Sequence, residues 1–246
     1  MKDNFSTQSA DYAKFRPVYP QELIDYLLSL TEAHEICWDC GTGNGQLAVQ
    51  LAETFQQVYA TDISEKQLSN ATQRGNIAYS LQPAEETNFP DQHFDLITVA
   101  QAAHWFDHSR FNREVKRTLK PDGVIALFGY GLVKIEGEVG EIITRFYWEV
   151  TNPYWDPERD HIEEEYRTIP FPFEQVKNVP SFAIRNQMTL DQLTGYISTW
   201  SAVQHYIRKN GHSPIEKLNE DLSKVWHSGM LEVVFPIFTK IGRMPA

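Results

Sequence analysis

The sequence predicts an α/β fold built on one mostly parallel sheet. Between residues 35 and 131, short apolar runs alternate with segments of helical periodicity, a pattern typical of parallel strands joined by crossover helices. A turn with three glycines joins the first apolar run to the helical segment after it. The last two runs are almost continuous in Val, Ile and Leu, so we place them in the centre of the sheet, covered on both faces.

The elements follow in order along the chain. Residues 20–30 carry an apolar stripe at Leu23, Tyr26, Leu27 and Leu30, which predicts a helix over one face of the sheet. Strands are expected at residues 36–40, 58–61, 78–81, 96–100 and 124–128. Helices are expected between them at residues 45–55, 65–74 and 109–119. The resulting order, β-α-β-α-β-β-α-β, is that of a sheet whose strands mostly run in one direction.

The character of the sequence changes after Gly131. Residues 141–154 are aromatic and helical, and residues 153–180 are rich in proline, acids and aromatics without a clean period, so we expect a cap there. Strand patterns return at residues 182–187 and 233–241, separated by helical patterns at 190–206 and 215–227. This last pair of strands is expected to complete the sheet with one antiparallel edge strand.

One structural domain is expected overall. Its core would comprise residues 1–134 and 229–246 with the strand near 181–188, and its cap residues 135–180 and 189–228. A chain of 246 residues with 41% hydrophobic content can bury one substantial core. The oligomeric state is left open.

Charge and hydropathy restrict the function classes. The net charge of −11 argues against a nucleic-acid surface, which needs clustered Lys and Arg, and favours a small-molecule substrate. No stretch approaches the roughly 20 apolar residues of a membrane span, and the N-terminus lacks an apolar signal segment, so we expect a cytoplasmic protein without membrane contact.

Two cysteines, Cys37 and Cys40, form a C-x-x-C pair. Zinc needs about four ligands, and the chain has no second pair. We interpret both as structural residues, with a disulfide or redox role as the alternative, and expect no metal.

The turn after the first strand carries the pattern Asp-x-Gly-x-Gly-x-Gly, from Asp39 through Gly41 and Gly43 to Gly45. Alternate glycines let the backbone pass close to a ligand, and the following helix offers unpaired N–H groups, so the turn is suited to a nucleotide-like cofactor. A dinucleotide fingerprint would need glycine at position 46, which is Gln46. A nicotinamide-dependent oxidoreductase is therefore the less favoured alternative.

The pattern resembles the first motif of the class I S-adenosylmethionine (SAM) methyltransferases. Residues 12–20, 103–106 and 199–204 further resemble the trans-aconitate methyltransferase-like small-molecule subgroup. The resemblance implies a Rossmann-like sheet, SAM as cofactor and methyl transfer to a small metabolite. A SAM-binding regulatory protein without turnover stays open as the rival, as do RNA or protein acceptors.

The resemblance also implies a set of cofactor contacts. Asp62, at the end of the second strand, would accept the ribose hydroxyls, with a helix-capping role as the alternative. Relatives often have Asp where this chain has Pro83, so backbone at Ala84 and the Glu85 side chain are expected to serve the adenine instead. The full cofactor-binding set is Tyr12, Arg16, Asp39, Gly41, Thr42, Gly43, Gly45, Asp62, Ile63, Ala84, Glu85 and Gln101.

Methyl transfer from a sulfonium is an in-line displacement, so the protein has mainly to align the acceptor. A carboxylate acceptor is already ionised at neutral pH and needs donors rather than a base, for which Tyr12, Arg16 and Trp200 are the candidates. A hydroxyl or amine acceptor would need a base, and His104 is the candidate for it, although packing or hydrogen bonding against the cofactor is the favoured interpretation of this residue. Arg208 would share a helix face with Trp200 and could hold a carboxylate.

Overall fold

The computed structural model describes residues 17–227 and 229–245. Its sheet has the strand order β3-β2-β1-β4-β5-β8-β6, with β7 also paired to β8. β1 to β5 run parallel, and β8 runs antiparallel to β5, β6 and β7. The predicted α/β class, a mostly parallel Rossmann-like sheet with one reversed strand in its edge region, is confirmed.

All the strands except β6, which the sequence did not predict, lie close to their predicted positions. They are β1 (Ile36–Cys40), β2 (Gln57–Asp62), β3 (Ile77–Leu81), β4 (Phe94–Ala100), β5 (Leu119–Tyr130), β6 (Glu174–Gln175), β7 (Phe182–Met188) and β8 (Leu231–Arg243).

The α-helices fall partly in the crossovers and partly in the C-terminal half. They are α2 (Gln21–Leu30), α3 (Gln46–Leu51), α4 (Glu65–Ser69), α5 (His108–Thr118), α6 (Gly137–Arg145), α7 (Asp160–Glu163), α8 (Leu190–Ser198), α9 (Ser201–Asn210) and α10 (Ile215–Ser223). Short 3-10 helices lie at η2 (Ala103–Trp105), η4 (Asn152–Tyr154) and η5 (Pro157–Arg159), and η3 (Phe146–Thr151) is π-helical.

Several predicted helices differ from the observed ones. α3 and α4 are shorter than expected, and α4 ends where the Asn70 amide donates to the carbonyl of Lys66. The helix expected over residues 190–206 is two helices, because Trp200 has extended backbone between them (φ −65°, ψ 135°). Trp200 is the N-cap residue of α9, and its side chain is buried.

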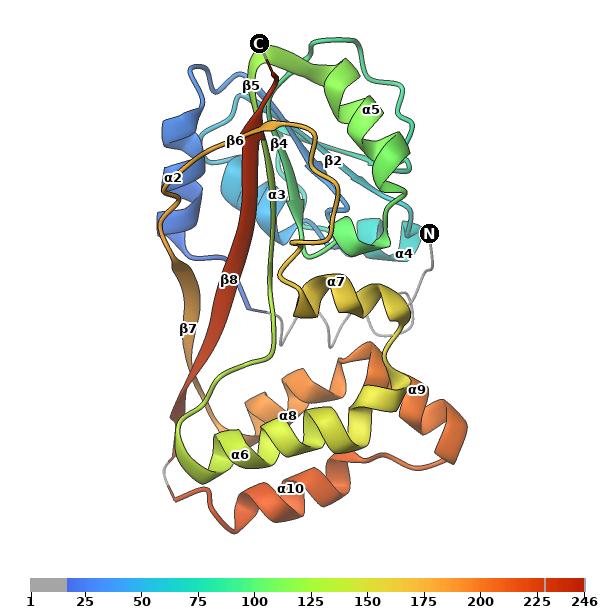
Figure 1. Ribbon diagram of the computed structural model, residues 1–246, viewed down its shortest axis with the longest axis vertical. Coiled ribbons are helices and arrows are strands. Elements are labelled where there is room, and N and C mark those ends of the chain that lie inside the picture. The colour runs from blue at the N-terminus through green and yellow to red at the C-terminus, as the bar shows by residue number, and fades with distance from the viewer. Residues whose placement is uncertain (1–16, 228, 246) are drawn as a thin grey trace.

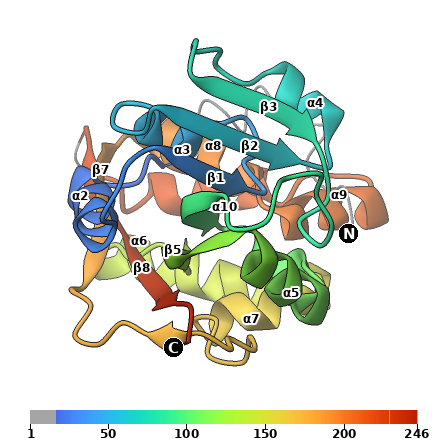
Figure 2. The same cartoon turned by 90° about the horizontal axis from the view of Figure 1, so that it is seen from above.

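Helices cover both faces of the sheet. α2 and α3 contribute to the hydrophobic cluster on one face, and α5 and α7 to the cluster on the other. Figure 2 shows α5 and α7 together beside β5, on the side away from α3. Such two-sided cover explains why the central strands β4 and β5 are buried along almost their whole length.

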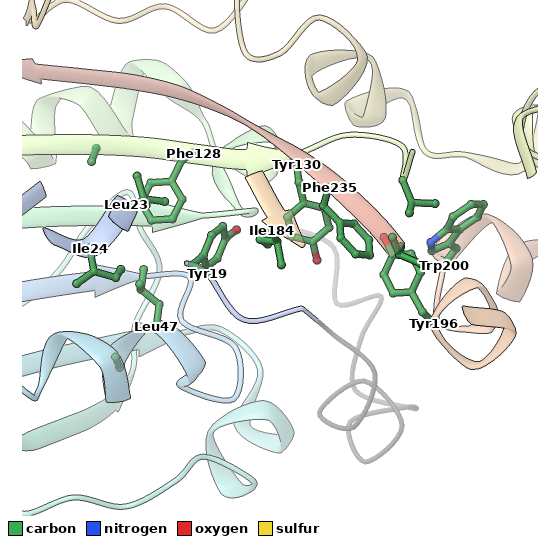
Figure 3. Close-up of a cluster of buried hydrophobic side chains, with 14 of the residues drawn as sticks. Tyr19, Leu23, Ile24, Leu47, Phe128, Tyr130, Ile184, Tyr196, Trp200 and Phe235 are labelled. Atoms are coloured by element: carbon green, nitrogen blue, oxygen red, sulfur yellow. The ribbon is translucent and has the colours of Figure 1, made fainter. Parts of the chain in front are cut away.

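The cap helices α6, α8, α9 and α10 lie beyond the carboxyl ends of the parallel strands, and the long strands β7 and β8 reach from the sheet toward them (Figure 1). Figure 3 shows that buried side chains continue from Leu23 and Phe128 in the sheet region to Tyr196 and Trp200 in the cap. Sheet and cap therefore share one hydrophobic cluster.

Residues 160–175, which were expected to belong to the cap, pack against the sheet. Ile162, Tyr166, Ile169 and Phe173 are buried in the cluster under α5, and β6 pairs with the end of β8. Aromatic and proline content alone did not distinguish this sheet-packing segment from the cap.

Cys37 and Cys40 are free, buried thiols in the two clusters on opposite faces of the sheet. Their separation to opposite faces agrees with the structural interpretation of the C-x-x-C pair. In the described parts of the chain, no helix combines the length and apolar character needed to cross a bilayer.

Candidate functional site

A pocket opens at the carboxyl ends of the parallel strands, between the sheet and the cap. The strand order changes direction between β1 and β4, and ligands of open α/β sheets bind at such a point. The lining residues used below are Asp39, Gly41, Thr42, Gly43, Asp62, Ile63, Gln67, Gln82, Ala84, Gln101, His104, Tyr130, Trp155, Asp156, Arg159, Tyr196 and Trp200.

The glycine turn between β1 and α3 forms one wall. The N–H groups of Gly41 and Thr42 both donate to the carbonyl of Thr61, at 2.9 Å each, which ties the turn to β2. Gly43 has φ +58°, lines the pocket and has nothing within 4 Å of where a Cβ would stand. Its backbone is therefore open to close approach by a ligand.

Gly45 has a different reason to be glycine. Its φ is +80°, and a Cβ there would stand 2.2 Å from the hydroxyl oxygen of Tyr79. It does not line the pocket and packs against Tyr79 at the start of α3, and its expected cofactor contact stays a prediction.

Asp39 anchors the turn from below. Its carboxylate accepts from the hydroxyl of Thr42 at 2.5 Å and from that of Thr98 on β4 at 3.1 Å. Burial raises the pKa of this carboxyl to about 6, although the two hydroxyl donors act in the opposite direction. Asp39 therefore holds the glycine turn in place.

The raised pKa of Asp39 predicts a pH-dependent stability. The unfolded chain releases the proton near pH 3.8 and the folded protein near pH 6, so folding stability falls between these values and levels off above them. Relative to Asp39→Asn, the free energy of unfolding of the unliganded wild type should fall by about 2 to 3 kcal/mol as the pH rises across this window. Denaturant unfolding at pH 4, 5, 6 and 7 measures the difference, and parallel stability curves for the two proteins would contradict it.

Asp62 stands at the end of β2, opposite the turn. Its Oδ2 accepts from the N–H of Gly43 and its Oδ1 from the N–H of Ser64, at 2.9 Å each. Ser64, not Asp62, caps α4, by accepting from the N–H of Gln67 at 3.3 Å. Ile63 follows Asp62 in the pocket wall.

The segment after β3 presents Gln82 and Ala84 to the pocket, but not Glu85. The Glu85 carboxylate instead accepts from the N–H of Asp107 at 2.9 Å, before α5. Pro83 is exposed and carries no polar side-chain atom.

Gln101 directly follows β4 and has an unusual backbone, at φ +55°. Its side-chain amide pairs with Tyr130 at the end of β5, accepting from the Tyr130 N–H at 2.8 Å and donating to the Tyr130 carbonyl at 3.1 Å. The left-handed conformation costs energy for a non-glycine residue, and this pair of hydrogen bonds offsets that cost. Gln101 thus joins the two central strand ends in the pocket wall.

His104 lies on η2 and is 7% exposed. Its Nδ1 is 3.1 Å from the hydroxyl of Tyr166, and its ring packs against Trp105 with centroids 4.8 Å apart. Burial raises the pKa of the Tyr166 phenol, so the phenol stays protonated and can donate to His104.

The cap wall is aromatic and contains an arginine that the sequence analysis did not select. Arg159 on η5 donates through Nε to the Tyr147 hydroxyl at 3.1 Å and to Glu163 at 3.0 Å. Its guanidinium carbon lies 4.6 Å from the centroid of Trp155. The one available signal was its position in an aromatic, acidic segment already assigned to the cap.

Trp200 lines the pocket as expected, at 4% exposure, and its ring lies 5.8 Å from that of Trp155. Arg208 is exposed on α9 and does not line the pocket, so it is not the carboxylate ligand considered above. Tyr12 and Arg16 lie outside the described residues.

Comparisons with known proteins bear on this geometry. A model described as a methyltransferase domain matches residues 38–127, the stretch from β1 into β5. A Dictyostelium discoideum protein named as a methyltransferase is 34% identical over 250 residues, covering 98% of this chain and 95% of the relative. The chain is a methyltransferase.

Structural neighbours agree with this family. A solved structure described as a type II methyltransferase from Anaeromyxobacter dehalogenans is 37% identical, with a TM-score of 0.87 over 94% of this chain and all of that one. The [4+2]-cyclase SpnF shares the fold at 16% identity and a TM-score of 0.52, over 98% of this chain and 94% of the cyclase. This methyltransferase is an enzyme that uses SAM as its cofactor.

The residues of the pocket fit that cofactor. The open backbone at Gly43 leaves room for close approach, and the buried carboxylate of Asp39 and that of Asp62 suit a ligand with ammonium and hydroxyl donors. These acids would hold the methionine and ribose parts, while Ala84 would face the adenine.

Proposed function

We propose that this methyltransferase transfers the methyl group to a carboxylate oxygen of a small metabolite, forming a methyl ester. The observation that carries the proposal is the arginine in the cap wall of the pocket. The Nε of Arg159 donates to Tyr147 and Glu163, and neither of its Nη atoms has a hydrogen-bond partner among the described residues. The remaining edge of the guanidinium can bind a carboxylate through two parallel hydrogen bonds.

A second hydrogen-bond donor in the pocket supports a substrate that offers several lone pairs, as a carboxylate does. The indole N–H of Trp155 is buried without a hydrogen-bond partner in the described parts of the chain. Asp156 adds a carboxylate at the same end, and its Oδ2 lies 3.8 Å from Nδ1 of His205. That pairing reduces its repulsion of an anionic acceptor when the imidazole is protonated.

Bound SAM supplies an electrophilic methyl group on a sulfonium centre. The chain's own part is to hold the acceptor in line, with Arg159 fixing the carboxylate and Trp155 and Trp200 excluding water. Alignment of this kind can lower the activation free energy of methyl transfer by on the order of 7 kcal/mol. A carboxylate has a pKa of about 4 and is ionised at neutral pH, so His104 need not act as a base.

The small-molecule acceptor also agrees with the net charge of −11, which disfavours a nucleic acid, and with a cap that packs onto the sheet and narrows the pocket. We extend the proposal to the expected domain division, in which the cap serves acceptor binding and the sheet serves the cofactor.

Matched acceptor pairs test the proposal. A panel of small carboxylic acids and their primary amides would be offered with methyl-labelled SAM, and kcat/KM measured for each member. We expect turnover only with acids, because the neutral amide has no charge for Arg159 to bind and is a poor nucleophile. Equal turnover of an acid and its amide, or turnover confined to alcohols or amines, would refute carboxylate methylation.

A further inference from the structure

We propose that the side-chain carbonyl of Gln67 accepts the hydrogen bond of the adenine amino group, in place of the carboxylate that position 83 lacks. The proposal concerns only cofactor binding and does not depend on the acceptor. It assumes, as the family resemblance implies, that the adenosine lies beside Asp62 and Ala84.

Gln67 lines the pocket, and its buried side-chain oxygen Oε1 lacks a hydrogen bond among the described residues. The residue is 4% exposed and lies on α4, five positions after Asp62. α4 packs against β2 and β3, the two strands whose ends carry the Asp62 and Gln82 walls. The amide is therefore placed between the two segments expected to contact adenosine.

The other side-chain acceptors near the end of β3 are already occupied. Gln82 accepts from the N–H of Asn88 at 2.9 Å and donates to Ser80 at 2.8 Å. The Glu85 carboxylate accepts from Asp107, and Pro83 has no side-chain acceptor. Among these residues, Gln67 is the one whose buried side-chain acceptor has no donor in the described parts of the chain.

A buried acceptor without a partner destabilises the unliganded protein, and a ligand that brings a donor removes that cost. The last torsion of a glutamine side chain is broad, so the amide can turn Oε1 toward a bound ligand with little strain. The adenine amino group is a neutral N–H donor and suits a neutral carbonyl acceptor.

Isothermal titration calorimetry with S-adenosylhomocysteine and its analogue lacking the adenine amino group tests the proposal. Wild type should prefer the parent compound by about tenfold. Gln67→Leu should bind the parent about tenfold more weakly and show no preference, because its side chain has similar size and no acceptor. Gln67→Glu retains an acceptor and should keep the preference.

Two further arms separate the possible outcomes. Gln73→Leu, an exposed glutamine after α4, should behave as wild type, and the unliganded Gln67→Leu protein should melt no lower than wild type. A Gln67→Leu protein that still prefers the amino compound would overturn the proposal. S-adenosylhomocysteine is also compared with its 2′-deoxyribose analogue. If Gln67→Leu lost only the preference for the 2′-hydroxyl compound, the proposal would be overturned as well, because the amide would then bind a ribose hydroxyl.

Discussion

Replacing Asp62 with alanine is expected to weaken S-adenosylhomocysteine binding by about a hundredfold. The carboxylate holds the N–H groups of Gly43 and Ser64, so its removal frees the glycine turn from the end of β2. It also removes the proposed acceptor of the ribose hydroxyls. Hydrogen bonds to a charged group contribute about 1.5 to 3 kcal/mol each, enough for the expected loss. Calorimetric titration measures the affinity directly.

The control for this variant is Asp25→Ala, an exposed acid on α2 away from the pocket, which should leave the affinity unchanged. Asp62→Asn keeps one acceptor oxygen and should fall between the two. An Asp62→Ala protein that binds within about threefold of wild type would show that the turn and the ribose are held by other groups.

Replacing Arg159 with methionine is expected to lower kcat/KM for the best acid acceptor by about a hundredfold or more, with cofactor affinity unchanged. Methionine keeps an unbranched apolar stem beside Trp155 but removes every donor of the guanidinium. Arg159→Lys retains the charge without the planar pair of donors, so it should recover part of the loss. Steady-state rates with the acid identified in the paired panel provide the measurement.

Arg185→Met is the matched control, because Arg185 is an exposed arginine on β7 that pairs with Glu232 and is not among the described residues that line the pocket. It should retain full turnover. Equal losses of acceptor turnover and of S-adenosylhomocysteine affinity in Arg159→Met would instead assign the arginine a role in the fold of the cap, through Tyr147 and Glu163.

The sheet could be predicted from sequence because each strand depends on local information. Apolar runs of five to seven residues, such as β1 and β4, are buried wherever the neighbouring strands fall, and the glycine turn fixes the chain's direction between them. The places of Asp39, Gly43 and Asp62 in the pocket wall could be predicted for the same reason, since each is positioned by the strand or turn that contains it.

The cap side depends on contacts between distant segments, which local patterns do not contain. Trp200 lines the pocket at a break between two helices, and its ring packs against that of Trp155, which comes from a distant segment of the chain. Arg159 reaches the pocket because Glu163 and Tyr147 hold its Nε, and no spacing rule connects the π-helical residue Tyr147 to η5. Glu85 was expected to contact the adenine, but its carboxylate accepts from the N–H of Asp107. That residue lies 22 positions away in the chain, so no local pattern indicates the contact.

The most direct test of methyl ester formation is the chemical stability of the transferred methyl group. The protein would be incubated with methyl-labelled SAM and a pool of small metabolites, and the labelled products treated with mild base. We predict that the label is released as methanol, because a carboxylate held by Arg159 yields a base-labile ester. Label that resists base would place the methyl group on an ether oxygen, nitrogen or carbon, contradict the account and bring His104 forward as a base.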